Sequence, residues 1–320
     1  METLKVGMIG AGSMANAVHY PSLSEFKDVT IEAICDLDRK RLGETADKYG
    51  IEKRYQDYRE MVDQNHLDAI YIVMPPHHLY DLVIYNLKKG LNVFMEKPPG
   101  VSLEQTRNMA LMAKRNDCLT MVAFNRRYIP LMRRVKSIVE ERGPIIQCMA
   151  TFFKNIPEIE HPYYQGAVDI LTCDAIHAVD TLRWMAGEVK GVKSSVRNIY
   201  ADYENSFNAL IEFEGGCVGF LVTNWVVGKR VHTFEMHAKG ISAFMDPNEK
   251  AVIYSDNKEE GLIIRADETA GSSEFAKYYG YYAENRHFID CIKECRQPET
   301  NLEDAVKTME LIEDIKCGRI

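Results

Sequence analysis

The sequence predicts an α/β protein in two parts: a parallel sheet covered by helices, then an α+β part with an open, mostly antiparallel sheet. Three observations support this. The first 125 residues alternate short apolar runs with amphipathic stretches, which is the pattern of right-handed βαβ units. The strands predicted there are almost entirely apolar, as expected where helices cover both faces of a sheet. After about residue 129, most predicted strands follow one another without intervening helices.

In the first part, we predict strands over residues 5–9, 30–35, 69–73, 92–95 and 119–123, and helices over 13–22, 39–49, 78–89 and 103–115. The second part opens with a helix over 132–141, which ends at a glycine-proline pair. A strand over 146–153 and a helix over 170–185 come next. Further strands are predicted over 193–197, 209–213, 218–224, 233–238, 243–245 and 252–254, and closing helices over 275–296 and 302–316.

Composition excludes several classes of protein. The chain has 320 residues, enough for two domains, and a net charge of -8 without a basic block, so nucleic acid is not an expected partner. No apolar stretch approaches a membrane span, and the N-terminus enters a strand pattern at once, so neither membrane insertion nor a signal peptide is expected. The eight scattered cysteines predict buried, reduced thiols in a cytoplasmic protein.

The first βα turn, "KVGMIGAGSMANA", has the spacing G-x-G-x-x-A with Gly10, Gly12 and Ala15. Gly10 would make the tight turn, Gly12 would admit a pyrophosphate close to the backbone, and Ala15 would allow close helix–strand packing. The phosphates would then lie at a helix N-terminus. An ordinary glycine-rich turn is the alternative, but the position between a strand and a helix favours a dinucleotide cofactor.

Asp36 ends the second strand, where an acidic residue binds the adenosine ribose hydroxyls. A 2′-phosphate about 4 Å away would be repelled by on the order of 4 kcal/mol at an effective dielectric near 20. The expected cofactor is therefore NAD, with NADP disfavoured. Arg39, Lys40 and Arg41 follow, and they either soften this preference or form a solvated helix surface.

The chain resembles the Gfo/Idh/MocA oxidoreductases over essentially its whole length. The resemblance rests on "GMIGAGSMA", "ICDLDRKR", "DAIYIVMPP", "GLNVFMEKPPG", "VAFNRRYIP", "DAIHAVDTLRWMAG" and "FIDCIKECRQPETNLEDAVKTMELIEDI". It implies an N-terminal Rossmann domain over residues 1–124 and a substrate-binding and oligomerisation domain over 125–320.

The resemblance also assigns roles around the Glu-Lys-Pro motif. It implies that Lys97 reaches toward the substrate hydroxyl beside the nicotinamide, and that the bond before Pro98 is commonly cis. Lys97 is then both a catalytic and a cofactor-site residue, and the other cofactor-site residues implied are Pro75, Glu96 and Arg126. The resemblance implies that the run of Arg126, Arg127 and Tyr128 has residues near the cofactor or the substrate. The alternatives are a surface lysine after a strand for Lys97 and plain helix-start surface for Arg126 and Arg127.

Two loops give weaker signals. His77 and His78 follow "MPP" and lie either near the cofactor or in solvent. His161, Tyr163 and Tyr164 in "HPYYQG" either line a sugar pocket or pack an ordinary loop.

The helix "LTCDAIHAVDTLRWMAG" carries Asp174, His177 and Asp180 at spacings of three, which place them on one face of an α-helix. His177 is the candidate base near neutral pH, with a neighbouring carboxylate to orient its ring. The family has an aspartate four residues before this histidine, where this chain has Cys173. Asp174 either replaces that aspartate or binds substrate, and a buried histidine held by an acid at a domain interface is the structural alternative. No third histidine is suitably spaced, so no metal is expected.

We therefore expect an NAD(P)-dependent dehydrogenase that transfers a hydride between a hydroxyl-bearing carbon of a sugar, polyol or cyclic alcohol and nicotinamide. One alternative is a lyase, glycosidase or epimerase that uses tightly bound NAD transiently. The other is a non-catalytic ligand sensor on the same fold. A homodimer or homotetramer, formed through the outer face of the second sheet, is expected.

Overall fold

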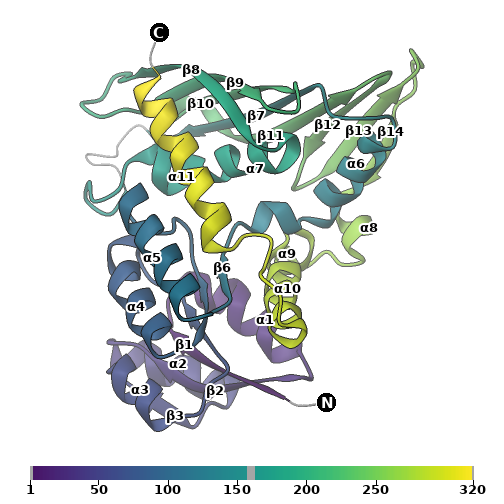
Figure 1. Ribbon diagram of the computed structural model, residues 1–320. Helices are drawn as coiled ribbons and strands as arrows, with labels where there is room; N and C mark the ends of the chain where they lie inside the picture. Colours follow the sequence, from purple (N-terminus) through teal and green to yellow (C-terminus); the bar gives the residue numbers. More distant parts are fainter. Residues whose placement is uncertain (1–2, 157–162, 319–320) are drawn as a thin grey trace. The chain divides into compact units, whose positions relative to one another are not determined.

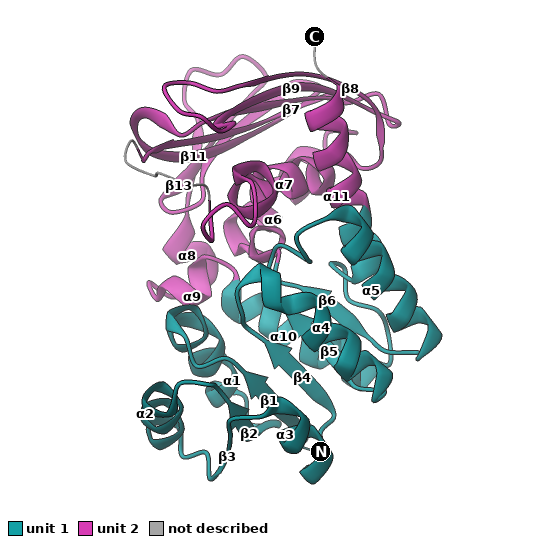
Figure 2. Cartoon of the chain, turned by 90° about the vertical axis from the view of Figure 1, so that its left-hand side faces the viewer, with its two compact units in different colours: residues 1–123, 281–306 teal, residues 124–280, 307–320 magenta. Residues whose placement is uncertain are grey.

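The computed structural model describes residues 3–156 and 163–318. The chain divides into two compact units (Figure 2). Unit 1 comprises Met1–Ala123 and Tyr281–Val306, and unit 2 comprises Phe124–Gly280 and Lys307–Ile320. Unit 1 is thus made of two segments that are far apart in the sequence. The division into functional domains between residues 124 and 125 stays a prediction.

Unit 1 contains a six-stranded parallel sheet in the order β3-β2-β1-β4-β5-β6. Its strands are β1 (Leu4–Ile9), β2 (Val29–Cys35), β3 (Lys53–Tyr55), β4 (Ala69–Ile72), β5 (Asn92–Met95) and β6 (Thr120–Val122). This order confirms the predicted Rossmann architecture, in which ligands bind beyond the carboxyl ends of the strands where the order reverses. The short, largely exposed β3 was not predicted.

The helices of unit 1 form two layers (Figure 1). The first helical run is a π-helical stretch, η1 (Ala15–His19), that continues into α1 (Tyr20–Glu25). The others are α2 (Arg39–Tyr49), α3 (Tyr58–Gln64), α4 (Pro76–Lys88), α5 (Leu103–Arg115) and α10 (Tyr281–Glu294). Contacts join α10 to α1 and α4 to α5 on opposite sides of the sheet. Side-chain caps start three of these helices, since Asp38 accepts from the backbone of α2, Asp57 from that of α3 and Ser102 from that of α5.

The segment 281–306 is tied to unit 1 by polar contacts. Asp28 accepts hydrogen bonds from Arg286, at 2.8 Å, and from Lys293. These hydrogen bonds, Arg286 first, lower the pKa of Asp28 to about 2. The single helix predicted over residues 275–296 is wrong, because α9 (Phe275–Tyr278) ends before α10 begins. Gly280 lies between them with φ +88°, and a Cβ there would come within 2.4 Å of the Asn125 carbonyl oxygen.

Unit 2 contains an eight-stranded sheet in the order β14-β13-β12-β11-β7-β10-β9-β8. The strands are β7 (Gln147–Asn155), β8 (Val189–Arg197), β9 (Ser206–Phe213), β10 (Val218–Asn224), β11 (Val226–Ala238), β12 (Ile241–Asp246), β13 (Lys250–Ser255) and β14 (Leu262–Arg265). Among the strands that the structure describes here, β7 and β10 are the one parallel pair, which confirms an open, mostly antiparallel sheet.

Helices cover one face of this sheet (Figure 1). α6 (Pro130–Glu140) packs on β11 to β13, and α7 (Ile176–Ala186) packs on β7 and β10. Burial alternates along the strands, as expected for a sheet with one covered face. The remaining helical segments are η2 (Asn125–Tyr128), η3 (Leu171–Ala175), α8 (Ala266–Ala270) and α11 (Leu302–Cys317).

All eight cysteines lie in the described part of the chain as free thiols; six are buried, and Cys295 and Cys317 are exposed. Within the described residues, no helix has the length and apolar character needed to cross a membrane.

Candidate functional site

The glycine turn after β1 has the two properties that a dinucleotide requires. Gly10 has φ +108°, and a Cβ there would lie 2.3 Å from the Val73 carbonyl oxygen, so only glycine fits. At Gly12, by contrast, a Cβ would meet no atom within 4 Å. Ala15 is fully buried at the start of the helical run. The turn is therefore closed toward β4 and open on the side where a pyrophosphate would approach.

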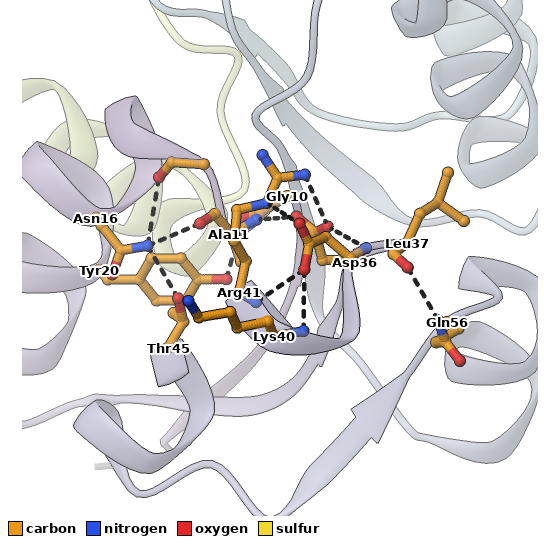
Figure 3. A network of polar contacts seen from close by, with 12 residues as sticks. Gly10, Ala11, Asn16, Tyr20, Asp36, Leu37, Lys40, Arg41, Thr45 and Gln56 are labelled. Atoms are coloured by element: carbon orange, nitrogen blue, oxygen red, sulfur yellow. Dashed lines mark hydrogen bonds and ion pairs between the residues drawn. The ribbon is translucent and has the colours of Figure 1, made fainter. Parts of the chain in front are cut away.

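Side chains from two neighbouring elements brace this turn (Figure 3). The Asn16 amide donates to the Ala11 carbonyl oxygen at 2.9 Å and to the Thr45 hydroxyl at 3.0 Å. The Tyr20 hydroxyl donates to the Gly10 carbonyl oxygen at 3.1 Å. Asn16 was missed by sequence reasoning, although an asparagine in the first helical turn is a residue that often bonds to nearby backbone.

Asp36 braces the turn from the other side. Its Oδ2 accepts from the Ala11 backbone N–H at 2.7 Å, and its Oδ1 accepts from the Asp38 N–H at 2.8 Å and from Arg41 Nη2 at 3.3 Å. A carboxylate offers about four acceptor positions, so these donors leave room for about one hydroxyl. Of the basic run, Arg41 contacts Asp36 while its side chain is 55% exposed, and Lys40 is a solvated surface residue.

The Glu-Lys-Pro loop after β5 is held by its own neighbours. Glu96 is buried and its Oε2 accepts from the Lys97 N–H at 3.1 Å. The Lys97–Pro98 bond is cis, as the resemblance implied. Thr106 at the start of α5 donates to the Pro99 carbonyl oxygen. Pro75 is the N-cap residue of α4 and lies three residues after the end of β4.

Sheet order places these segments together. The glycine turn follows β1, Asp36 follows β2, Pro75 follows β4 and Lys97 follows β5, and these four strands are consecutive in the sheet. Because the strands are parallel, all four segments lie at the same carboxyl edge. His77 and His78, after Pro76, are exposed.

A buried network behind Glu96 was not predicted. His19, the last residue of the π-helical η1, is fully buried, with Nε2 3.0 Å from Glu96 Oε1. Its Nδ1 lies 3.1 Å from Asn285 Nδ2, which belongs to α10. The Asn285 Oδ1 atom is also 3.3 Å from Nδ1, so the ring contacts Glu96 on one side and the Asn285 side-chain amide on the other. His19 thus fixes the carboxylate that holds the Lys97 backbone.

In unit 2, Asp174 lies in η3, a second π-helical stretch, which leads into α7. Its carboxylate accepts from the Lys154 ammonium, at the end of β7, and from the Tyr163 hydroxyl. Burial, with Asp174 as a further cause, raises the pKa of Tyr163, so its hydroxyl stays protonated and donates. The α-helical spacing used to place Asp174 beside His177 does not hold through a π turn, and its role toward His177 stays a prediction. Lys154 was missed by sequence reasoning because it is a strand residue far from the helix.

His177 is buried near the start of α7, and its carbonyl oxygen accepts from the Thr181 hydroxyl at 2.6 Å. Asp180 is engaged elsewhere. It accepts from Arg127 Nε at 2.8 Å and Nη2 at 2.5 Å, and from the Thr308 hydroxyl at 2.9 Å. Asp180 therefore belongs to a buried ion pair.

The two arginines of "NRRYIP" are both buried. Arg126 is 4% exposed and Arg127 is 5% exposed, so the interpretation of this run as helix-start surface is wrong. The assignment of Arg126 to the cofactor stays a prediction. Tyr164 is exposed with φ +55°, and His161 lies outside the described residues.

Across residues 3–156 and 163–318, no group of three or more His, Cys, Asp or Glu side chains is placed to hold a metal ion.

Two family models match the chain. The one described as "Oxidoreductase family, NAD-binding Rossmann fold" matches residues 4–124, and the one described as "GFO/IDH/MocA C-terminal domain" matches residues 132–242. Among named proteins, the myo-inositol 2-dehydrogenase of Thermotoga maritima is 25% identical over 326 residues, covering 94% of this chain and 92% of that protein.

Solved structures share the fold over almost the full length. A dehydrogenase from Chromobacterium violaceum superposes with a TM-score of 0.90 at 23% identity, covering 100% of this chain and 96% of that one. An oxidoreductase from Agrobacterium radiobacter, solved in complex with NAD+, L-tartaric acid and magnesium, gives a TM-score of 0.83 at 20% identity, covering 97% and 94%. At these identities, the two structures establish the fold alone.

Proposed function

Because the chain belongs to the Gfo/Idh/MocA family of NAD(P)-dependent oxidoreductases, we propose that it oxidises a hydroxyl-bearing carbon of a sugar, polyol or related cyclic alcohol with NAD. When bound, NAD supplies the nicotinamide ring that accepts the hydride. The residues that would hold it are the backbone of Gly10 and Gly12, the Asp36 carboxylate, and the segments around Pro75 and Glu96.

Three side chains would carry out the chemistry at the substrate. Lys97 would donate a hydrogen bond to the reacting oxygen and stabilise negative charge as it develops there. His177 would accept the hydroxyl proton as general base. Asp174, held by Lys154 and Tyr163, would either orient His177 or bind a further hydroxyl group.

One observation carries the proposal. The open glycine turn, the buried Asp36 and the fixed Lys97 follow strands of one parallel sheet and share its carboxyl edge. A nucleotide site and a cationic hydrogen-bond donor at that edge are what oxidation of an alcohol requires. The relative from Thermotoga maritima, named for an inositol, supports a polyol as the class of substrate.

The test is turnover with NAD+ and a panel of sugars, inositols and linear polyols, followed by NADH absorbance and product analysis. Lys97→Met should lower kcat by about 10²–10³-fold while retaining NADH binding, by analogy with loss of one oxyanion donor. Lys114→Met is the matched control, because that side chain is 74% exposed in unit 1. Near-normal turnover of Lys97→Met would remove Lys97 from the mechanism.

The same assay separates the rival chemistry. A lyase, glycosidase or epimerase that uses NAD transiently would consume substrate without net NADH, and its cofactor would remain bound through purification. A ligand sensor would bind nucleotide and ligand without converting either.

The proposal includes an assembly and a compartment. The sheet face of unit 2 that α6 and α7 leave uncovered exposes Leu210, Phe244 and Tyr254, each about two-fifths accessible, and Phe244 and Tyr254 lie 6.2 Å apart between ring centroids. We infer a homodimer or homotetramer through this face, in the cytoplasm, where thiols stay reduced. Light scattering should show a multimer that Phe244→Lys dissociates, and a monomeric wild type would contradict the inference.

A further inference from the structure

Arg126 is a buried cation with no counter-ion among the residues that the structure describes. It lies in η2, directly after the last strand of unit 1 in the chain, between the rings of Phe152 and Tyr279, at 5.3 and 5.7 Å from their centroids. Its polar contact within the described residues is a long one, from Nη1 to the Asn125 side-chain oxygen at 3.4 Å. Its Nε is buried and makes no hydrogen bond to any described residue.

His232 adds a second buried donor beside the same ring. It stacks on Phe152, with ring centroids 3.4 Å apart, and is 4% exposed. Burial, then the charges of Arg126 and Arg230, lower the pKa of His232 to about 2, so the ring is neutral. Its Nδ1 lies 3.4 Å from Arg230 Nη2, and a guanidinium can only donate. The proton is therefore on Nε2, which is buried and finds no acceptor in the described part of the chain.

The charged groups described near Phe152 do not neutralise Arg126. Lys154 also lies against Phe152, at 5.8 Å from the ring centroid, and it already has the Asp174 carboxylate as its partner. An arginine keeps its charge at any ordinary pH, and a buried charge without a partner is unfavourable. The neighbouring Arg127 shows the usual solution, a bidentate pair with Asp180.

We propose that Arg126 and His232 bind the carboxylate of an acidic substrate, so that the enzyme oxidises a hydroxy acid or sugar acid. A carboxylate offers two acceptor oxygens in the plane that matches a guanidinium. This inference rests on the proposed function and narrows its class of substrate. The other candidate anion is the cofactor pyrophosphate, which the proposed function assigns to the open Gly12 turn of unit 1. The contacts of Arg126 are instead with Phe152 and Tyr279 of unit 2, and Phe152 also contacts Lys154, the partner of Asp174.

The experiment compares matched probes on the NADH-loaded protein. D-gluconate is paired with D-glucitol, and L-tartrate with L-threitol. Within each pair, the acid has a carboxylate where the polyol has a hydroxymethyl group. Dissociation constants come from quenching of NADH fluorescence and from thermal melting. The wild type should bind at least one acid about ten- to a hundredfold more tightly than its polyol, the range for a hydrogen bond to a charged group.

Variants test whether Arg126 causes the preference for acids over polyols. Arg126→Met should bring the ratio of acid to polyol affinity to within about twofold of one, and Arg126→Lys should retain part of it. Arg134→Met, an exposed arginine on α6, is the matched control and should keep the full ratio. The wild-type comparison needs no variant, so a poorly folded variant does not remove the test.

Several results would overturn the inference. These are a wild type that binds no acid in the panel, a wild type that prefers the polyols, and an Arg126→Met variant that keeps the acid preference. Loss of NADH affinity in Arg126→Met with an unchanged ratio would assign the guanidinium to the cofactor. Because the readout is binding, acid preference without turnover would support the carboxylate site while contradicting the proposed dehydrogenase.

Discussion

The buried polar network of unit 1 and the group around Phe152 in unit 2 differ in how completely their hydrogen bonds are satisfied. In unit 1, both ring nitrogens of His19 have partners, and both Glu96 oxygens accept a hydrogen bond. In unit 2, Arg126 Nε and His232 Nε2 are equally buried but have no partner among the described residues. A network closed within the protein fixes geometry, whereas an open one at the same depth indicates where a ligand belongs.

The largest effect on stability should come from a substitution at Arg127, which follows Arg126 in the chain and forms an ion pair with Asp180. Arg127→Met would leave the Asp180 carboxylate buried with Thr308 as its remaining partner, and should lower the free energy of unfolding by about 3–5 kcal/mol. Arg126→Met removes a charge that no described residue compensates, and should leave stability unchanged or higher. Chemical denaturation measures both. Arg142→Met, in an exposed pair with Asp256, controls for loss of a surface ion pair and should cost about 1 kcal/mol or less. Equal losses for Arg126 and Arg127 would contradict the comparison.

His232 should make the protein sensitive to acid. Its pKa is about 2 in the folded state and 6.5 ordinarily, so below pH 6.5 the unfolded state binds a proton that the folded state does not. As the pH decreases below 6.5, His232 should therefore lower the free energy of unfolding by at most about 1.4 kcal/mol per pH unit. The charges that act on the ring are those of Arg126, Arg230, Lys154 and Asp174.

The test for His232 is a series of denaturation curves between pH 7 and pH 5. His232→Phe, which preserves the ring stack on Phe152, should flatten the decline, and the exposed His66→Phe should not. An unchanged slope in His232→Phe would show that other groups govern acid stability.

Removing His19 from the buried network of unit 1 should destabilise the protein less than Arg127→Met does, and it should also lower kcat. His19→Phe removes the His19 contacts of Glu96 Oε1 and of the Asn285 amide, which keeps its hydrogen bond to the Tyr281 carbonyl oxygen, and should cost about 1–3 kcal/mol. Because Glu96 then loses its orientation, kcat should fall while KM changes little, since Lys97 acts mainly on the transition state. Unfolding curves and steady-state rates measure the two effects, with His66→Phe as control. Loss of stability with normal kcat would make His19 purely structural.

The smallest effect is expected at Arg41. Its contact with Asp36 is long and its side chain is 55% exposed, so Arg41→Ala should change stability by less than about 1 kcal/mol. Without the Arg41 guanidinium, the Asp36 carboxylate should repel a 2′-phosphate more strongly, so the preference for NAD over NADP should increase. Calorimetric titration with both nucleotides measures this, and Lys40→Ala, whose side chain is 83% exposed, is the control. A wild type that binds NADP as tightly as NAD would refute the role assigned to Asp36.

Local patterns predicted most of the fold because apolar runs and glycine spacing are short-range signals. They placed five of the six strands of the parallel sheet and the glycine turn, whereas the cis Lys97–Pro98 bond was implied by the family resemblance. They could not show that a predicted helix breaks at Gly280, because the cause is the backbone of Asn125, far away in the chain.

The site was predictable where one segment carries it and hidden where distant segments meet. Lys97 belongs to a recognisable motif. His19, Asn285 and Lys154 acquire their partners only through tertiary packing, at sequence separations of 266 for His19–Asn285 and 20 for Lys154–Asp174. The π turn at Asp174 likewise breaks the helical period on which the pairing with His177 depended.

The two-segment composition of unit 1 has a consequence for biosynthesis. Its first segment leaves the ribosome long before Tyr281–Val306, and all of residues 124–280 are made in between. At about 5–20 residues per second, this interval lasts on the order of ten to thirty seconds. During it, the surfaces that later receive α10, including Asp28 and the ring of Phe26, have no partner from that helix. The packing of α10 that completes unit 1 thus forms only near the end of translation, although all six strands of its sheet are made early, and a chain truncated before Tyr281 should remain a target for chaperones and proteases.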